Sequence, residues 1–213
     1  MIDNWLSLLR RNRAFAVIRA SEFEMGRQMA RAVAASGMEL IEITWNSVDA
    51  PNLINKLRCE LPSCTIGTGT ILNSQDLHDA IACGVEYIFT PHIDPELIRI
   101  ATAKNIPIIP GALTPTEIVT AWNLGAPSIK VFPVQSLGGT SYIKSLQGPL
   151  KHIPLIPTGG VTIENAEQFL SAGAIAVGLS GELFPQALIR ARNWEAITQN
   201  AKKLLQNINT SLL

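Results

Sequence analysis

The sequence predicts an α/β fold in which eight short parallel strands alternate with helices. Three observations lead to this prediction. Short apolar β runs alternate with helical patterns along the whole chain. Four of these runs follow a glycine that suits the left-handed cap of a preceding helix, at Gly37, Gly84, Gly125 and Gly173. The intervals between these glycines are 47, 41 and 48 residues, about twice the span of one βα unit, so further strands are expected between them.

The eight expected strands cover residues 15–19, 40–44, 64–69, 87–90, 106–110, 129–132, 153–157 and 176–178. A helical pattern follows each strand, which means parallel pairing with helical crossovers. A length of 213 residues is at the compact end for a closed (β/α)8 TIM barrel. Residues 3–12 are expected to form an extra N-terminal helix, and residues 182–190 and 193–206 to complete the outer layer. The competing architecture, an open doubly wound sheet, lacks its Gly-x-Gly-x-x-Gly turn after the first strand.

Length and composition favour a single domain, residues 1–213, with a small molecule as its partner. The chain is 47% hydrophobic, which is enough for one well-buried core, and it is short for two domains. Its 17 Lys and Arg residues equal its 17 Asp and Glu residues, so neither nucleic acid nor an anionic membrane is an expected partner. No apolar run reaches the length of a membrane span, and the N-terminus lacks a secretory signal, so a cytoplasmic location is expected.

Neither the cysteines nor the histidines show the spacing of a metal site. The three cysteines are odd in number and have no Cys-x-x-Cys spacing, which argues against a disulfide framework and against a zinc site. His78, His92 and His152 are too far apart in sequence for a His-x-x-x-His pair. We therefore expect reduced cysteines and no bound metal.

Two charged residues interrupt strands that should be apolar. Lys130 lies within the run 129–132, and Glu42 lies within the run 40–44. Parallel strands are covered on both faces, so a charge in mid-strand is costly unless it is paired or used. One interpretation is a buried ion pair kept for structure, although desolvation offsets most of its attraction. The other, which we favour, is a catalytic pair, because barrel enzymes place their reactive groups near the carboxyl ends of strands.

A buried lysine near a carboxylate suits imine chemistry. An amine in a partly dry pocket loses proton affinity, and only the neutral amine attacks a ketone carbonyl. Lys130 is therefore the predicted nucleophile. Glu42 is the group predicted to move protons through the carbinolamine and then to act on the substrate hydroxyl whose deprotonation breaks a carbon–carbon bond. The protonated imine accepts the electrons of that bond, so the expected reaction needs no metal and no organic cofactor.

Glycine-containing loops follow the seventh and eighth strands. Thr158-Gly159-Gly160 precedes a helix expected to begin near Thr162, and Gly178-Leu179-Ser180-Gly181 follows the last strand. In barrels, these two loops and a helix N-terminus form the usual phosphate site, because glycines let main-chain N–H groups approach an anion. The alternative is that both are only tight turns between a strand and a helix. Their joint occurrence favours phosphate binding.

Further side chains at strand ends are expected to line the same pocket. Arg19 ends the first strand, where it can clamp a carboxylate or a phosphate, or form only a rim ion pair; we favour the clamp. By strand alternation, Thr44 and Phe132 face the same way as the two charged residues, although core packing is an equal alternative for both. Thr70 directly follows the third strand.

These residues belong to longer motifs that resemble one known family, the KDPG (2-keto-3-deoxy-6-phosphogluconate) aldolases. The family includes 4-hydroxy-2-oxoglutarate (KHG) aldolases and 2-keto-3-deoxy-6-phosphogalactonate aldolases. The resemblance covers nearly the whole chain and rests on residues 41–44 (IEIT), 66–73 (IGTGTILN), 90–91 (TP), 109–111 (IPG), 129–133 (IKVFP) and 157–162 (PTGGVT). Several motifs in the right order are far more specific than one glycine-rich turn.

The resemblance implies a class I aldolase that cleaves KDPG to pyruvate and glyceraldehyde 3-phosphate, a carbon–carbon lyase of the Entner–Doudoroff pathway. It implies Lys130 as the imine lysine and Glu42 as the proton shuttle, with no cofactor. It also implies a homotrimer. The expected contacts with the phosphorylated keto acid are Thr70, Pro91 and Thr158, with Gly159 and Gly160 as phosphate donors.

Two positions depart from the family's pattern. Some phosphogluconate enzymes have an arginine two residues after the position of Thr44, where it holds the substrate carboxylate; this chain has Asn46. Others carry the arginine on the first strand, as Arg19 is here, and this combination is also typical of the phosphogalactonate type. Both epimers and hydroxy-oxoglutarate are therefore open as substrates. The last phosphate loop commonly has Gly-Ser, where this chain has Ser180-Gly181; both residues are expected at the substrate, with their individual roles open.

Functions of two other classes compete with the aldolase. A phosphate-binding barrel isomerase or synthase without imine chemistry would explain the glycine loops, but it leaves Lys130 without a purpose. A non-catalytic binding barrel would explain the fold, but it would leave both buried charges as a cost without a use.

Overall fold

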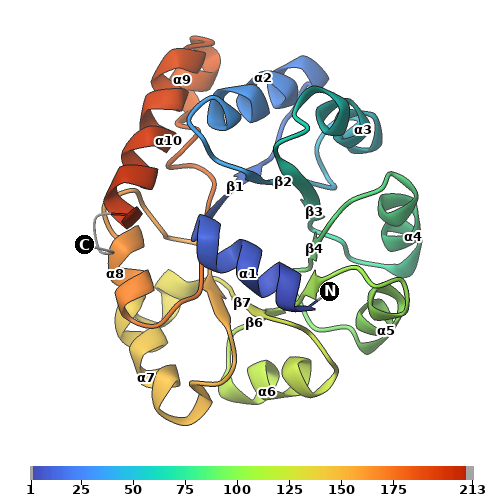
Figure 1. The fold of residues 1–213 in the computed structure, drawn as a ribbon, viewed down its shortest axis with the longest axis vertical. Coiled ribbons are helices and arrows are strands. Elements are labelled where there is room, and N and C mark those ends of the chain that lie inside the picture. Colours follow the sequence, from blue (N-terminus) through green and yellow to red (C-terminus); the bar gives the residue numbers. More distant parts are fainter. Residues whose placement is uncertain (1, 210–213) are drawn as a thin grey trace.

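The computed structural model describes residues 2–209 and has parallel strands at its centre with helices around them (Figure 1). The helices are α1 (Ile2–Asn12), α2 (Phe23–Ala34), α3 (Ala50–Glu60), α4 (Ser74–Ala82), α5 (Pro95–Ala103), α6 (Pro115–Asn123), α7 (Thr140–Leu150), α8 (Ala166–Ser171), α9 (Gln186–Arg190) and α10 (Trp194–Asn209), with a 3-10 helix η1 (Val134–Leu137). The strands are β1 (Ala14–Ile18), β2 (Leu40–Thr44), β3 (Thr65–Gly69), β4 (Ile88–Phe89), β5 (Ile108–Ile109), β6 (Gly111–Ala112), β7 (Ile129–Val131), β8 (Leu155–Pro157) and β9 (Val177–Leu179). Residue 1 and residues 210–213, which the predicted domain includes, lie outside the described residues.

All strand pairs are parallel, and they form two sheets. The strand order is β5-β4-β3-β2-β1-β9 in one sheet and β6-β7-β8 in the other. The sheets meet at one side where β5 and β6 are separated only by Pro110, whose carbonyl accepts a hydrogen bond from the Lys130 N–H at 2.9 Å. At the other side, a parallel bridge joins Thr158 to Gly178. The α/β fold with parallel strands and helical crossovers is therefore as the sequence predicts.

The expected strand 106–110 is shortened to β5 (108–109), and a further short strand, β6, which was not expected, follows Pro110. Proline has no N–H to donate to a neighbouring strand, so Pro110 interrupts the ladder on its donor side. Its carbonyl still takes part, as the bond from Lys130 shows. The two pieces follow one another directly and carry the chain past β4 and towards β7.

Local sequence explains where several helices begin and end. The four glycines expected to follow helices all have positive φ, between 75° and 105°. Helix α6 begins with a capping box, in which the Thr114 hydroxyl accepts from the Glu117 N–H and the Glu117 carboxylate accepts from the Thr114 N–H. Pro115 is its first residue, a position where the missing N–H costs nothing.

Two helices begin later than the sequence analysis expected. The helix expected near Thr162 begins at Ala166, because residues 162–165 form a turn in which the Thr162 N–H donates to the Asn165 side chain and the Asn165 N–H donates to the Thr162 hydroxyl. The helix expected over 182–190 begins at Gln186, after Pro185. The N-terminal helix and the last helix agree with their expected positions, 3–12 and 193–206, to within a few residues.

The interior enclosed by the strands contains four aromatic side chains among aliphatic ones. Phe15 stacks on Phe89 with ring centroids 4.8 Å apart, and Tyr87 packs edge-on against Phe89 at 5.8 Å. Trp5 of α1 lies 5.1 Å from Tyr87 and donates from its ring N–H to the buried Ser128 hydroxyl at 3.0 Å. Helix α1 thus covers the interior from one end (Figure 1). A functional site can therefore lie at the opposite end of the interior.

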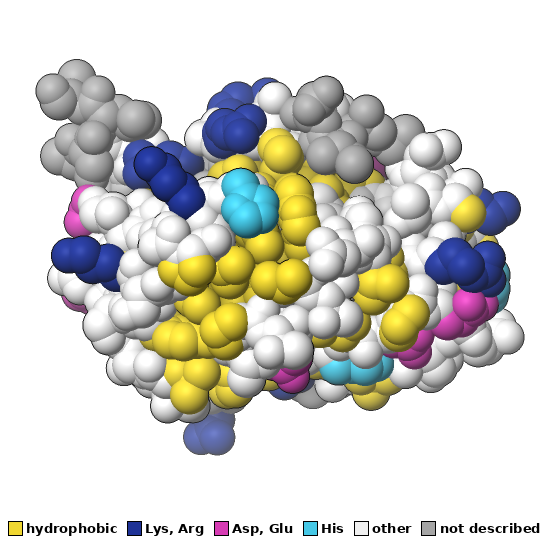
Figure 2. All heavy atoms as spheres, turned by 90° about the horizontal axis from the view of Figure 1, so that it is seen from below, with side chains coloured by type: hydrophobic (Ala, Val, Ile, Leu, Met, Phe, Trp, Pro, Cys, Tyr) yellow, Lys and Arg dark blue, Asp and Glu magenta, His cyan; other side chains and the backbone are white. Residues whose placement is uncertain are grey.

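The side of the molecule that carries α6 and α7 has hydrophobic side chains gathered over a broad area (Figure 2). Leu124, directly after α6, and Leu137, in η1, are 38% and 42% exposed. Apolar groups collected on one face, and not scattered singly, are typical of a protein–protein contact. None of the described helices combines the length and the apolar character that a bilayer span requires.

Candidate active site

A cavity of about 540 Å³ opens at the carboxyl ends of the strands. This cavity lies at the end of the interior opposite to α1, because Trp5 of α1 contacts Tyr87, Tyr87 packs against Phe89, and the Phe89 ring lies next to Lys130. All twelve residues that the sequence analysis selected line this one cavity: Lys130, Glu42, Arg19, Thr44, Thr70, Pro91, Phe132, Thr158, Gly159, Gly160, Ser180 and Gly181. The strands and loops that carry them are far apart in sequence, so their convergence is a property of the fold.

Lys130 projects into this cavity from the middle of β7. Its neighbours Ile129 and Val131 are fully buried among the helices, and strand alternation turns Lys130 the other way. The side chain is 8% exposed, and its Nζ lies 5.6 Å from the ring centroid of Phe89 and 5.0 Å from that of Phe132. Burial lowers the pKa of Lys130; the Glu42 charge opposes that shift and the Arg19 charge adds to it.

Glu42 enters the cavity from β2 and is 1% exposed. Burial raises the pKa of its carboxyl group, while the charges of Lys130 and Arg19 lower it. Its Oε2 atom has no hydrogen-bond partner, which is rare for a buried polar atom and is typical of groups kept for a ligand. The neighbouring strand makes room for it, because a Cβ atom at Gly69 would lie 1.8 Å from Glu42 Oε1.

Lys130 and Glu42 do not form an ion pair. Every ion pair between described residues involves other side chains, and the two groups influence each other only through their charges. A buried pair kept for structure needs direct contact and further hydrogen bonds to offset desolvation. The geometry instead leaves an amine and a carboxylate facing one cavity with space between them, as an acid–base pair acting on a bound molecule requires.

Arg19 lies directly after β1 at the mouth of the cavity. Its guanidinium forms no hydrogen bond or ion pair with any other residue that the structure describes, so the rim ion pair weighed as an alternative is not formed. Thr44, by contrast, is buried and bonded into the wall: its hydroxyl lies 3.2 Å from the Ser47 hydroxyl, which accepts from the Ala20 N–H at 3.1 Å. Thr70 has a φ of 63°, an unusual left-handed conformation for a threonine.

The two glycine loops lie together, but one expectation about them is wrong. Gly159 and Gly160 have φ values of 81° and 92°, as tight turns require. They were expected at a helix N-terminus, yet α8 begins only at Ala166, with a turn between. Support from a helix dipole therefore does not apply directly to these glycines. The Gly160 carbonyl accepts from the Asn165 amide at 3.1 Å, which ties the loop to that turn.

Five further residues line the cavity: Val17, Val161, Thr162, Glu182 and Gly178, the last of which begins the predicted glycine loop after the eighth strand. Val17 could have been found by alternation, since it lies in β1 two residues before Arg19, which directly follows that strand. Glu182 carried no sequence signal beyond its closeness to Ser180. Its carboxylate is the one feature of the loop region that opposes an anion.

Comparisons with known proteins agree with this site. A sequence model described as KDPG and KHG aldolase matches residues 6–200. A 2-dehydro-3-deoxy-phosphogluconate aldolase of Haemophilus influenzae is 31% identical over 181 residues, 84% of this chain and 85% of that protein. A KDPG aldolase from Legionella pneumophila, solved with pyruvate captured as a covalent carbinolamine, superposes with a TM-score of 0.86 at 26% identity, over 93% of this chain and 97% of that one. A structure described as native KDPGal has a TM-score of 0.85 at 29% identity, over 93% and 95% of the two chains.

These matches extend over nearly all of the chain and include the strands and loops that line the cavity. They argue against the two competing classes, an isomerase or synthase and a non-catalytic barrel. The chain belongs to the KDPG and KHG aldolase family, whose members are carbon–carbon lyases.

Proposed function

We propose that this protein is a class I aldolase that cleaves KDPG to pyruvate and glyceraldehyde 3-phosphate through an imine on Lys130. The observation that carries the proposal is the buried Lys130 amine, with a lowered pKa, facing an unpartnered Glu42 oxygen across one cavity. A lowered pKa increases the neutral fraction of the amine, which is the form that attacks a carbonyl. The captured carbinolamine of the Legionella relative supports the same chemistry here.

The reaction follows from these two groups. Neutral Lys130 attacks the C2 ketone, and Glu42 supplies and removes the protons that turn the carbinolamine into a protonated imine with loss of water. Glu42 then takes the proton of the C4 hydroxyl, the C3–C4 bond breaks, and its electron pair moves to the imine nitrogen, forming an enamine while the aldehyde leaves. Protonation at C3 and addition of water release pyruvate. The imine nitrogen accepts the electrons, so the proposed route uses no metal or organic cofactor.

Borohydride trapping with pyruvate tests this proposal. Reduction should fix one three-carbon adduct, and peptide mass spectrometry should locate it on Lys130. Lys144 and Lys151 serve as internal controls, because both lie outside the cavity. An adduct on either of them, or no adduct, would contradict the proposal.

The preferred substrate is a finer part of the proposal. Asn46 lies outside the Lys130 cavity, whereas Arg19 lines it without a partner, so Arg19 is the residue proposed to hold the substrate carboxylate. The alternatives are the phosphogalactonate epimer and hydroxy-oxoglutarate. Cleavage of all three compounds, compared by kcat/KM, decides among them.

We propose that Gly159, Gly160, Ser180 and Gly181 surround the substrate phosphate. Gly181 offers the cleanest test, because a Cβ there would meet no atom within 4 Å, whereas a Cβ at Gly160 would lie 2.3 Å from the Cβ of Gln135. Gly181→Asp should raise KM for a phosphorylated substrate by about tenfold or more through charge repulsion, and Gly181→Asn, its neutral isostere, should raise it much less. Equal effects of the two changes, or equal effects on unphosphorylated hydroxy-oxoglutarate, would separate the loop from phosphate.

We further propose that the two sheets form one closed eight-stranded barrel in a single domain, and that the protein is a cytoplasmic homotrimer. The contacts at Pro110 and between Thr158 and Gly178 support closure, since they join the sheets on both sides. The apolar face over α6 and α7 supports self-association (Figure 2). Sedimentation equilibrium at low micromolar concentration measures the assembly, and a monomer would contradict it.

A further inference from the structure

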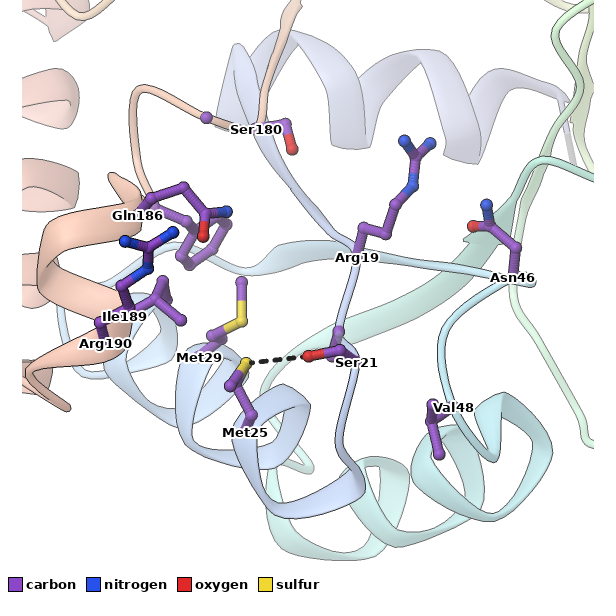
Figure 3. Close-up of a pocket in the computed structure, with 13 residues that line it drawn as sticks. Arg19, Ser21, Met25, Met29, Asn46, Val48, Ser180, Gln186, Ile189 and Arg190 are labelled. Atoms are coloured by element: carbon purple, nitrogen blue, oxygen red, sulfur yellow. Dashed lines mark hydrogen bonds between the residues drawn. The ribbon is translucent and has the colours of Figure 1, made fainter.

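A second cavity, of about 870 Å³, adjoins the Lys130 cavity and shares Arg19, Ser180 and Gly181 with it. It lies where α9 and the loop after β9 face α2 and the end of β1 (Figure 3). No residue unique to it has a part in the proposed imine chemistry. The shared residues make it an extension of the site on the far side of Ser180.

The lining of this second cavity carries two positive charges and no negative charge. Arg19 and Arg190 are its only ionisable residues. The Arg190 guanidinium, like that of Arg19, forms no hydrogen bond or ion pair with any residue in the described part of the chain. Arg192, two residues further on, lies 3.9 Å from Glu22 and forms an exposed ion pair with it. An arginine fork without a carboxylate partner suits phosphate or carboxylate oxygens.

Both polar and hydrophobic side chains line the second cavity near Arg190. Figure 3 shows the Gln186 side chain beside the Arg190 guanidinium, with Ser180 and Arg19 on the other side of the cavity. Hydrophobic side chains that are almost fully buried, Met29, Phe184 and Ile189, line the same cavity. Arg190 and Gln186 are themselves exposed, so an anion from solution can reach them.

The negative charge of Glu182 favours the extension of a bound anion into the second cavity. Its carboxylate lines the Lys130 cavity and is absent from the lining of the second one. A phosphate close to Ser180 and Gly181 is therefore repelled from the Glu182 side and attracted to the Arg190 side. Near their shared residues, the Lys130 cavity therefore has the negative charge of Glu182, whereas the second cavity has the positive charge of Arg190.

We infer that Arg190 and Gln186 form a second oxyanion subsite, beside Arg19 and Ser180, that takes a phosphate or carboxylate group. The group is either the phosphate end of the substrate bound at Lys130, a source that rests on the proposed function, or a free oxyanion. The subsite itself does not depend on the imine chemistry. It assigns Arg190 a binding role that no sequence motif indicates.

Calorimetric titration of the full chain with inorganic phosphate at low ionic strength tests the subsite. Arg190→Ala should weaken phosphate binding by about tenfold, because it removes a charged bidentate donor. Arg192→Gln is the matched control, since it changes a nearby but already paired arginine, and it should bind as the wild type does. Wild-type affinity in Arg190→Ala would overturn the inference.

Cleavage kinetics then identify the source of the anion. If the substrate phosphate occupies the subsite, Arg190→Ala raises KM for the phosphorylated substrate by about tenfold and leaves pyruvate trapping on Lys130 unchanged. If a free oxyanion occupies it, phosphate binding is lost while KM is unchanged. Should trapping fail in the wild type, the proposed function fails, yet the phosphate titration still decides on the subsite.

Discussion

Burial displaces the pKa values of Lys130 and Glu42 in opposite directions. It lowers the pKa of the amine and raises that of the carboxyl group, because each site disfavours its charged form. At neutral pH this increases both the neutral amine needed for attack and the fraction of carboxyl group that can donate a proton. A single physical cause thus prepares both partners for the proposed reaction.

The pH dependence of imine formation should reveal which charges act on Lys130. Trapping by borohydride should increase through a pKa below the ordinary value of 10.5. Glu42→Gln removes a negative charge that raises this pKa, so its profile should shift to lower pH; Arg19→Ala removes a positive charge that lowers it, so its profile should shift to higher pH. Initial trapping rates across the pH range measure both, and shifts of the same sign would contradict this account.

Gly69 should act as a positioning residue for Glu42. Gly69→Ala places a methyl group where Glu42 Oε1 lies, and the atom displaced is the end of a flexible side chain, so the fold should survive. We expect kcat to decrease towards that of Glu42→Gln, for which a loss of about a hundredfold or more is typical of a general acid–base group. In the Glu42→Gln background, the same change should have little further effect.

Gly148→Ala is the control for this substitution. A Cβ there meets no atom within 4 Å, and the position lies inside α7, away from the cavity. It should leave kcat unchanged and stabilise the protein by about 0.5–1 kcal/mol. A fully active Gly69→Ala would show that Glu42 tolerates displacement and does not act where the structure has it.

At the scale of elements, β2 and β7 each carry a charged side chain that no described side chain of a neighbouring element pairs with. Replacing both, as Glu42→Gln with Lys130→Met, should abolish activity and raise the free energy of unfolding by about 1–3 kcal/mol at neutral pH. Urea denaturation measures it. A less stable double variant would show that the pair serves the fold.

The pH dependence of this gain follows from the two shifts. The Glu42 pKa is raised above its ordinary value of 4.5, so its cost to stability is absent below pH 4.5 and grows as the pH rises to the folded-state pKa. The Lys130 pKa is lowered from 10.5, so its cost is complete below the folded-state pKa and disappears above pH 10.5. The gain should therefore be greatest between the two folded-state values.

At the scale of the whole molecule, the aromatic contacts at the α1 end stabilise the fold, whereas the proposed catalytic groups lie at the opposite end. Trp5 holds α1 against the end opposite to the cavity, through its contact with Tyr87 and its bond to Ser128. Trp5→Phe should keep most of the packing, leave the buried Ser128 hydroxyl without its partner, and lower stability by about 1 kcal/mol, or roughly 2–4 °C in Tm. Thermal unfolding and kcat, measured together, test this; a changed kcat would mean that the two ends are coupled.

The sequence by itself determined the order of the elements and the membership of the site. Strands and helix ends follow from local patterns, such as a glycine before a β run, and a charge within an apolar strand is visible without any structure. That is why Lys130 and Glu42 could be selected from the chain alone. Helix boundaries were predicted less accurately where a turn held by side-chain hydrogen bonds occupies the place of the expected first helical turn, as with Thr162 and Asn165.

Only the tertiary structure decided how the selected groups stand relative to one another. That Lys130 and Glu42 share a cavity without pairing, and that Gly69 leaves room for the carboxylate, depends on strands brought together by pairing between distant segments. Arg190 reaches the cavity because α9 packs near the end of β1, some 170 residues away in sequence. Periodicity describes one element at a time, whereas distances between elements are set by how their buried faces pack, and a single sequence does not display those contacts.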